Sequence, residues 1–345
     1  MQFTLRPDSV IERIALWFNL GPVPLVQAFF GMTAARAAMA GARLGIYGAL
    51  ADRAETCEAL ARRLGTSASG LELLLESLRA LGAVRSRGDR YELAPRARRW
   101  LDPRSPRYVG DFLAFNYTQW QWWGQLEEAV RTGRGPLIHD YPPDDPRWDE
   151  YIRAMFQLAR LAAPEIDLRL RLPREARRIA DLGGGHGWFS ASLCRRRPEL
   201  RATVVDLPGA VRAGRAILAT TPYASRVQHI EGDARTAELG RDLDAVLIFQ
   251  LLHHLTPDEC RALLQRAASA LKPGGKVAIL EVFRDEGRTS ASALLALHYF
   301  LVSSASAYRR DAVERWLREA DLTQIRSARI RSLPLQTLIV GMRPG

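Results

Sequence analysis

The sequence predicts an α/β fold in which a doubly wound parallel sheet follows a mostly helical N-terminal domain. From about residue 175 onward, apolar runs of strand length alternate with helical segments, which is typical of a parallel sheet covered by helices. Residues 1–110 instead combine helical periodicity with one short hairpin. A chain of 345 residues is long enough for two or three domains of this kind.

The N-terminal domain shows a helix, a second helix and a hairpin in this order. The segment 57–64 is expected to form a helix capped by Thr56. A second helix follows, with leucines repeating at helical spacing, and Gly82 is expected to end it. Two short strands then flank a turn at 87–89. This order is typical of a winged-helix domain.

A connecting segment joins the two halves of the chain. Residues 111–132 are rich in aromatic side chains and are predicted to form one helix, and a Pro- and Asp-rich loop separates it from a helix at about 147–170. The predicted division is therefore 1–110, 111–174 and 175–345. The strands expected in the last part are 179–182, 202–206, 227–231, 245–251 and 276–283.

Composition and charge limit the class of protein. No apolar run is long enough to predict a membrane span, and the three cysteines have no metal-binding or disulfide spacing. The net charge of +11 raises the alternative of a DNA-binding regulator, but the helix at 69–79 that would enter the major groove carries Glu72 and Glu76 against Arg79. All but two of the 49 basic residues are arginine. We therefore expect no nucleic-acid partner, no membrane, no metal and a cytoplasmic location.

A glycine-rich loop is the sharpest local signal. The residues Asp181-Leu182-Gly183-Gly184-Gly185-His186-Gly187 follow the first predicted strand and open a helix. Glycines let a backbone approach a ligand closely, and the helix N-terminus offers free N–H groups to an anion. Acidic residues follow at the ends of the next two strands, as Asp206 and as Gly232-Asp233-Ala234. These signals predict a ligand site at the carboxyl edge of the sheet.

Two later motifs follow these along the chain, D-A-V-L-I-F-Q-L-L-H-H and L-K-P-G-G-K-V-A-I-L-E. Taken in this order, the motifs resemble those of S-adenosylmethionine-dependent methyltransferases. More narrowly, the chain is similar to small-molecule O-methyltransferases of plant phenolic and bacterial natural-product pathways. The resemblance implies a Rossmann-like catalytic sheet, S-adenosylmethionine as methyl donor with S-adenosylhomocysteine as product, and a homodimer. By resemblance, the expected cofactor-binding residues are Asp181, Gly183, Gly184, Gly185, Asp206, Leu207, Gly232, Asp233, Ala234 and Phe249.

The histidine pair His253-His254 precedes Thr256-Pro257-Asp258-Glu259, a capping box that starts a helix. A histidine in this strand-to-helix loop can accept a proton near neutral pH. In the family resembled here, the position of His253 is the catalytic base, and the glutamate at the position of Glu281 orients it. The alternatives for these two residues are a packed histidine and a salt-bridged or helix-capping glutamate.

The resemblance also implies residues that contact the methyl acceptor: Phe115, Asn116, Trp120, Met155, Phe156, His254 and His298. Two departures from the phenolic members of the family leave the acceptor open. No acidic residue stands at 307–310, and His254 and Leu255 occupy the positions of the family's Asp-Trp. The primary expectation is O-methylation of an aromatic or polyketide-like molecule. The alternatives are C-methylation of a tetrapyrrole or another natural product, and cyclisation or hydroxylation that uses the same cofactor.

Dimerisation is expected through the N-terminal helices, because apolar side chains crowd them. These are Leu16, Trp17, Phe18, Val26, Phe29 and Phe30. Such a concentration exceeds what an isolated surface usually exposes.

Overall fold

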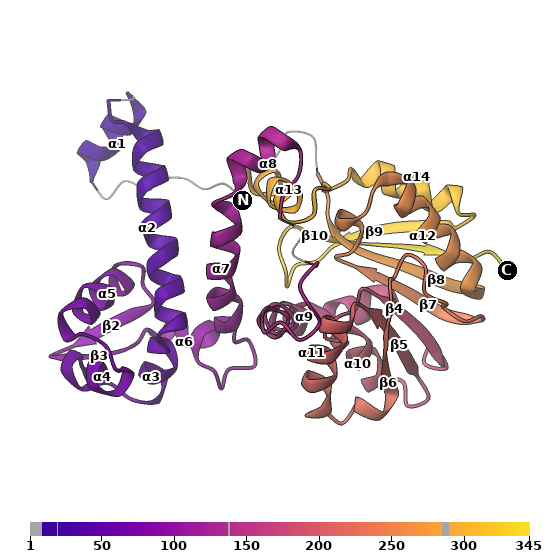
Figure 1. The fold of residues 1–345 in the computed structure, drawn as a ribbon, viewed down its shortest axis with the longest axis horizontal. Helices are drawn as coiled ribbons and strands as arrows, with labels where there is room; N and C mark the ends of the chain where they lie inside the picture. The colour runs from indigo at the N-terminus through magenta and orange to yellow at the C-terminus, as the bar shows by residue number, and fades with distance from the viewer. Residues whose placement is uncertain (1–8, 19, 137–138, 285–289) are drawn as a thin grey trace. The chain divides into compact units, whose positions relative to one another are not determined.

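The computed structural model describes residues 9–18, 20–136, 139–284 and 290–345. The chain divides into two compact units, residues 2–120 and residues 121–345 (Figure 1). The boundary falls within one helix, α7 (Gly110–Trp123). The finer three-part division stays a prediction.

The N-terminal unit contains the two helices and the hairpin that the sequence predicts. The side chain of Thr56 accepts a hydrogen bond from the Ala59 N–H and caps α4, and Gly82 has a φ of 72° just past α5. A short strand pairs with the hairpin and makes a three-stranded sheet in the order β1-β3-β2. The elements are α1 (Val10–Trp17), α2 (Val23–Arg43), α3 (Ile46–Asp52), β1 (Glu55–Thr56), α4 (Cys57–Leu64), α5 (Ala68–Ala80), β2 (Val84–Arg87), β3 (Arg90–Leu93), α6 (Pro95–Leu101) and the first part of α7.

The connecting segment differs from the prediction of one helix over 111–132. The structure has two helices there, α7 and α8 (Leu126–Thr132), with a break at Gly124 and Gln125. Glycine is unfavourable inside a helix because it gains the most conformational freedom on unwinding. The predicted helix at about 147–170 is confirmed as α9 (Arg147–Leu170).

The C-terminal unit is built on a seven-stranded sheet in the order β6-β5-β4-β7-β8-β10-β9. The five predicted strands are parallel neighbours, whereas β10 is antiparallel to both β8 and β9. The strands are β4 (Arg178–Leu182), β5 (Arg201–Asp206), β6 (Val227–Glu231), β7 (Leu243–Phe249), β8 (Leu271–Val282), β9 (Thr323–Arg329) and β10 (Gln336–Met342). The helices are α10 (Trp188–Arg195), α11 (Pro208–Ala219), α12 (Pro257–Ala270), α13 (Ser290–Ser303) and α14 (Arg310–Glu319), with short 3₁₀ turns η1 (Ala224–Arg226) and η2 (Leu252–His254).

Helices cover both faces of this sheet (Figure 1), and apolar side chains pack between the helices and the strands. Successive side chains of a strand point to opposite faces, so Leu280 packs with α9 and α10 while Ile279 packs with α12 and α14. The carboxyl ends of the parallel strands meet at one edge, where the intervening loops carry the polar residues of the candidate site.

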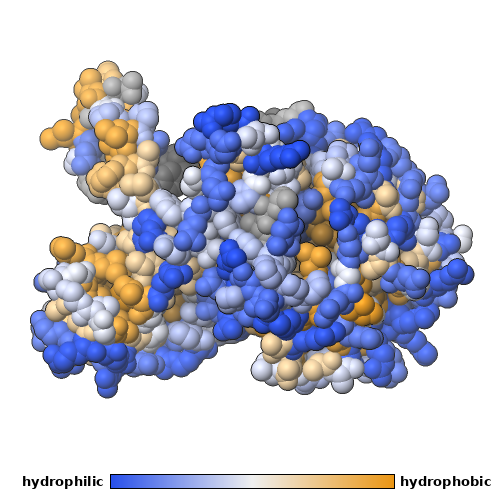
Figure 2. All heavy atoms as spheres, in the orientation of Figure 1, coloured by the Kyte–Doolittle hydropathy of each residue, from blue (hydrophilic) through white to orange (hydrophobic). Residues whose placement is uncertain are grey.

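Figure 2 shows apolar side chains on the surface of the N-terminal helices. Trp17 is 83% exposed and Phe30 is 60% exposed. Val10, Ile11, Ile14, Phe18, Leu20, Leu25, Phe29 and Met32 are exposed as well. In the described part of the chain, α2 is the one helix whose length and hydropathy would suffice to cross a membrane.

Candidate active site

A cavity of about 450 Å³ opens at the carboxyl edge of the sheet in the C-terminal unit. Its lining includes these residues that the sequence predicted: Met155, Gly183, Gly184, Gly185, Asp206, Leu207, Gly232, Asp233, Ala234, Phe249 and His254. Further lining residues had no sequence signal that singled them out, among them His139, Trp148, Tyr151, Arg235, Gln250, Ser303 and Gln336.

The glycine-rich loop after β4 needs its glycines for steric reasons. Gly183 and Gly185 have φ values of 68° and 43°, in the left-handed region that side chains disfavour. A Cβ on Gly184 would lie 2.5 Å from the carboxyl carbon of Asp181. The loop therefore passes directly over the Asp181 side chain and leaves its backbone open to a ligand.

Asp181 lies fully buried beneath this loop. One carboxylate oxygen accepts a hydrogen bond of 2.7 Å from the Ser190 hydroxyl, and the other, Oδ1, has no partner among the described residues. Burial raises the pKa of Asp181 to about 7. A cationic group bound near this buried carboxyl would stabilise its ionised form and lower its pKa again.

Asp206 holds the same loop from the end of β5. Its two carboxylate oxygens accept hydrogen bonds of 2.7 Å from the Gly185 and Leu207 N–H groups. Burial raises the pKa of Asp206 to about 6, although these two hydrogen bonds act in the opposite direction. At neutral pH the carboxylate presents a negative charge to the cavity.

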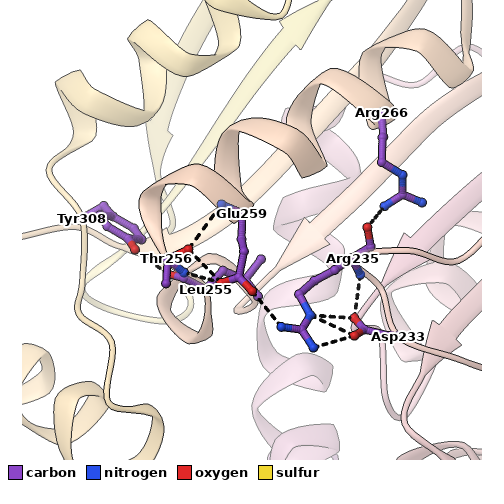
Figure 3. Close-up of polar contacts among 7 residues, drawn as sticks. All are labelled: Asp233, Arg235, Leu255, Thr256, Glu259, Arg266 and Tyr308. Carbon is purple, nitrogen blue, oxygen red and sulfur yellow. Dashed lines mark hydrogen bonds and ion pairs between the residues drawn. The ribbon is translucent and has the colours of Figure 1, made fainter.

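An ion-pair chain ties the loop after β6 to the start of α12 (Figure 3). The Arg235 guanidinium donates to Asp233 and, at 2.7 Å, to Glu259. Glu259 in turn completes the predicted capping box with Thr256, which is confirmed. The Arg235 hydrogen bonds hold the pKa of Asp233 below its usual range. The chain thereby links the Asp233 loop to the helix that directly follows the histidine pair.

His253 is buried and forms a hydrogen-bonded pair with Glu281. The His253 Nδ1 lies 2.9 Å from Glu281 Oε2, while Glu281 Oε1 accepts the Leu252 N–H at 2.9 Å. A carboxylate can only accept, so Nδ1 carries the proton. The ring stacks on Tyr299 with centroids 3.8 Å apart. The other nitrogen, Nε2, has no hydrogen-bond partner within the described part of the chain.

Three further histidines surround His253. The ring of His254 lies 4.1 Å from that of His253, and His139 meets the edge of His254 at 4.5 Å. His254 Nδ1 also forms a hydrogen bond with the Ser303 hydroxyl. Burial lowers the pKa of His139 and of His298 to about 4 and that of His254 well below its ordinary value, and repulsion from His253 adds to each effect. Near neutral pH these side chains are uncharged.

The remaining predicted site residues are not among those that line the cavity. Phe156 packs against His186 and Trp188, and His298 stacks on Trp123. Asp181, His253 and Glu281 lie behind the lining, in contact with residues that form it. Phe115, Asn116 and Trp120 belong to the N-terminal unit. Among the described residues, no cluster of histidine, cysteine and acidic side chains has the arrangement of a metal site.

The raised pKa of Asp181 predicts a pH-dependent stability difference. The folded ligand-free protein holds this proton more tightly than the unfolded chain, so ionising Asp181 lowers the free energy of unfolding as the pH rises from about 4 to about 7. Asparagine does not ionise. The Tm of Asp181→Asn minus that of the wild type should therefore increase between about pH 5 and pH 7 and then level off. A Tm difference that is constant over this range in thermal unfolding experiments would contradict the assignment.

Comparisons with known proteins agree with this fold. An O-methyltransferase domain model matches residues 123–317, and an O-methyltransferase dimerisation domain model matches residues 26–103. The tetracenomycin polyketide synthesis 8-O-methyltransferase of Streptomyces glaucescens is 30% identical over 94% of this chain and 97% of its own. The 3-hydroxy-5-methyl-1-naphthoate 3-O-methyltransferase of Streptomyces sahachiroi is 28% identical over 93% of this chain and 95% of its own. The structure of human N-acetylserotonin methyltransferase with S-adenosylmethionine shares the fold, with a TM-score of 0.83 and 20% identity. The match covers 99% of this chain and 100% of the human chain.

The doubly wound sheet, the glycine-rich loop and the acidic strand ends define an S-adenosylmethionine-dependent methyltransferase. The chain belongs to the O-methyltransferase family, since the two family models cover most of its length. The Rossmann-like fold class and the resemblance predicted from the sequence are thereby confirmed.

Proposed function

We propose that the protein methylates a hydroxyl group of an aromatic or polyketide-like small molecule in secondary metabolism, in the cytoplasm, with His253 as general base. The observation that carries this proposal is the buried His253–Glu281 pair beside the cavity that the glycine-rich loop borders. The named substrates of the Streptomyces relatives, a naphthoate and a polyketide, support this acceptor class.

The residues around the glycine-rich loop fit S-adenosylmethionine. Asp181 retains an unpartnered buried oxygen beneath the loop, which suits a nearby cationic ligand, and the three loop glycines line the cavity without side chains. We assign Asp206 to the ribose hydroxyls and Asp233 with Ala234 to the adenine, with Phe249 and Leu207 lining the same space. When bound, S-adenosylmethionine supplies an electrophilic methyl group on a sulfonium centre.

In this proposal His253 Nε2 takes the proton of the acceptor hydroxyl. The Glu281 carboxylate holds the Nδ1 proton and stabilises the positive charge that the ring gains. The Leu252 N–H fixes Glu281, and the stacked Tyr299 ring fixes the plane of the imidazole. Met155 and the uncharged His254 and His139 rings line the space for a flat, weakly polar acceptor.

Transfer of a labelled methyl group tests this function. Purified enzyme should label a hydroxynaphthalene on its oxygen and should leave the matching methyl ether unlabelled, because the ether has no hydroxyl to deprotonate. Mass spectrometry of the product locates the label. Label on a ring carbon, or equal labelling of the ether, would contradict O-methylation and favour the C-methylation alternative.

We further propose that a second copy of the chain covers the apolar surface of α1 and α2. The dimerisation domain model includes most of α2, whose exposed Phe29 and Phe30 are otherwise costly to leave in water. Light scattering should give about twice the chain mass of 38.6 kDa. Phe29→Glu with Phe30→Glu should reduce the mass to that of one chain, while the exposed control Leu294→Glu should not. A monomeric wild type, or partition of the wild type into detergent micelles, would contradict the dimer.

A further inference from the structure

Gln336 is a buried polar residue next to a layer of apolar core side chains. It begins β10 and is paired with Val282 of β8. Because side chains alternate along a strand, the Gln336 side chain lies on the same face as Leu338, which packs in the core layer with Phe249 and Leu280. Gln336 lines the cavity together with Leu280, and so do Val302 and Leu333.

The Gln336 amide lacks a hydrogen-bond partner for its oxygen. The residue is 9% exposed, and Oε1 is fully buried without a partner among the residues that the structure describes. An unpaired buried amide oxygen destabilises a protein, so native proteins rarely retain one without a reason. The preceding residue, Leu335, has a φ of 76°, a strained conformation for a residue with a side chain. Strain and an unsatisfied polar group together are typical of a binding position.

The order of the strands separates Gln336 from the reacting centre. The cofactor-binding residues follow β4, β5 and β6, whereas His253 follows β7, and β8 lies between β7 and β10. Neighbouring strands are about 4.8 Å apart, so β10 lies about 10 Å from β7 across the sheet. This distance is the length of a fused-ring aromatic molecule rather than of a single ring.

We propose that Gln336 is a specificity residue whose side-chain amide turns its oxygen toward the cavity and accepts a hydrogen bond from a second hydroxyl or N–H group, at the end of the acceptor remote from the methylated oxygen. The substrate class is thus a fused-ring aromatic with polar groups at both ends. This inference rests on the proposed function, which supplies the aromatic acceptor.

Binding measurements test the inference separately from catalysis. The probes are 1,5-dihydroxynaphthalene, which has hydroxyls on both rings, and 1-naphthol, which lacks the second one. Calorimetry on the dimeric enzyme saturated with S-adenosylhomocysteine gives both dissociation constants without turnover. The wild type should bind the dihydroxy compound at least about tenfold more tightly, because a site built for a hydroxyl rejects the analogue without it.

Gln336→Leu should abolish this preference and bind 1-naphthol as the wild type does, since it loses only the amide. Gln228→Leu, at an exposed position on β6, is the matched control and should keep the preference. Because Oε1 has no protein partner to lose, Gln336→Leu should unfold at or above the wild-type Tm. If the branched leucine side chain prevents folding, Gln336→Met is used in its place.

Equal affinity of the wild type for both probes, or a preference that survives in Gln336→Leu or Gln336→Met, would overturn the role of Gln336. Loss of affinity for both probes to the same extent would overturn it too. Absence of methyl transfer together with a preference that depends on Gln336 would instead refute the proposed function and leave the binding role intact.

Discussion

Replacement of His253 by alanine is expected to lower kcat by about 10³ while the affinity for S-adenosylmethionine stays unchanged. The variant loses a buried imidazole whose Nδ1 is held by the Glu281 carboxylate and whose Nε2 has no hydrogen-bond partner among the described residues. In the described part of the chain, no hydrogen bond joins His253 or Glu281 to the glycine-rich loop or to Asp206, which we assign to the cofactor. Single-turnover methyl transfer and calorimetry with the cofactor measure the two quantities separately.

Two further variants distinguish a base from a structural histidine. Glu281→Gln keeps the volume of the side chain but loses the charge, so kcat should fall by less than in His253→Ala. His254→Ala removes a lining residue and should act mainly on KM for the acceptor. An unchanged single-turnover rate in a folded His253→Ala enzyme would refute the role of His253 as base. A loss of cofactor affinity equal to the loss of rate would show that His253 supports the site rather than the chemistry.

Asp206→Asn is expected to weaken S-adenosylmethionine binding by about 30-fold or more. Asparagine has the same shape, but it lacks the charge and turns an N–H donor toward the Gly185 or the Leu207 N–H. If Asp206 binds the ribose as we propose, the variant loses those charge-assisted hydrogen bonds, and it loosens the loop that carries Gly185. Calorimetric titration of the wild type and the variant with the cofactor measures the effect.

Asp242→Asn serves as the matched control, because its side chain is 75% exposed in the loop before β7, at the opposite end of the strand from the site. It should bind the cofactor as the wild type does. Equal dissociation constants for Asp206→Asn and Asp242→Asn would exclude Asp206 from the cofactor site.

Much of the site follows from short-range rules that act within a few residues. Three glycines after an apolar strand predict a loop close to a ligand, and the φ values of Gly183 and Gly185 agree. The capping box at Thr256 likewise predicts where α12 begins. The break at Gly124 was predictable in kind, because glycine is unfavourable inside a helix, but the predicted helix ran through it.

Long-range packing accounts for what the sequence pattern missed. The strand β9 is mostly polar and exposed at the edge of the sheet, so it has no apolar run to mark it, and the antiparallel insertion of β10 beside β8 has no local cause. That insertion brings Gln336 to the cavity that His254 also lines. His139 reaches His254 from a loop more than a hundred residues earlier in the chain.

The local pattern was thus sufficient for the fold class, the cofactor loop and the candidate base, because glycine conformation, helix capping and strand alternation depend on neighbouring residues. The contact between the candidate base and Glu281, which the resemblance implied, and the far wall of the cavity depended on folding. Glu281 meets His253 only because β7 and β8 pair side by side, and Gln336 lines the cavity only because β10 joins them.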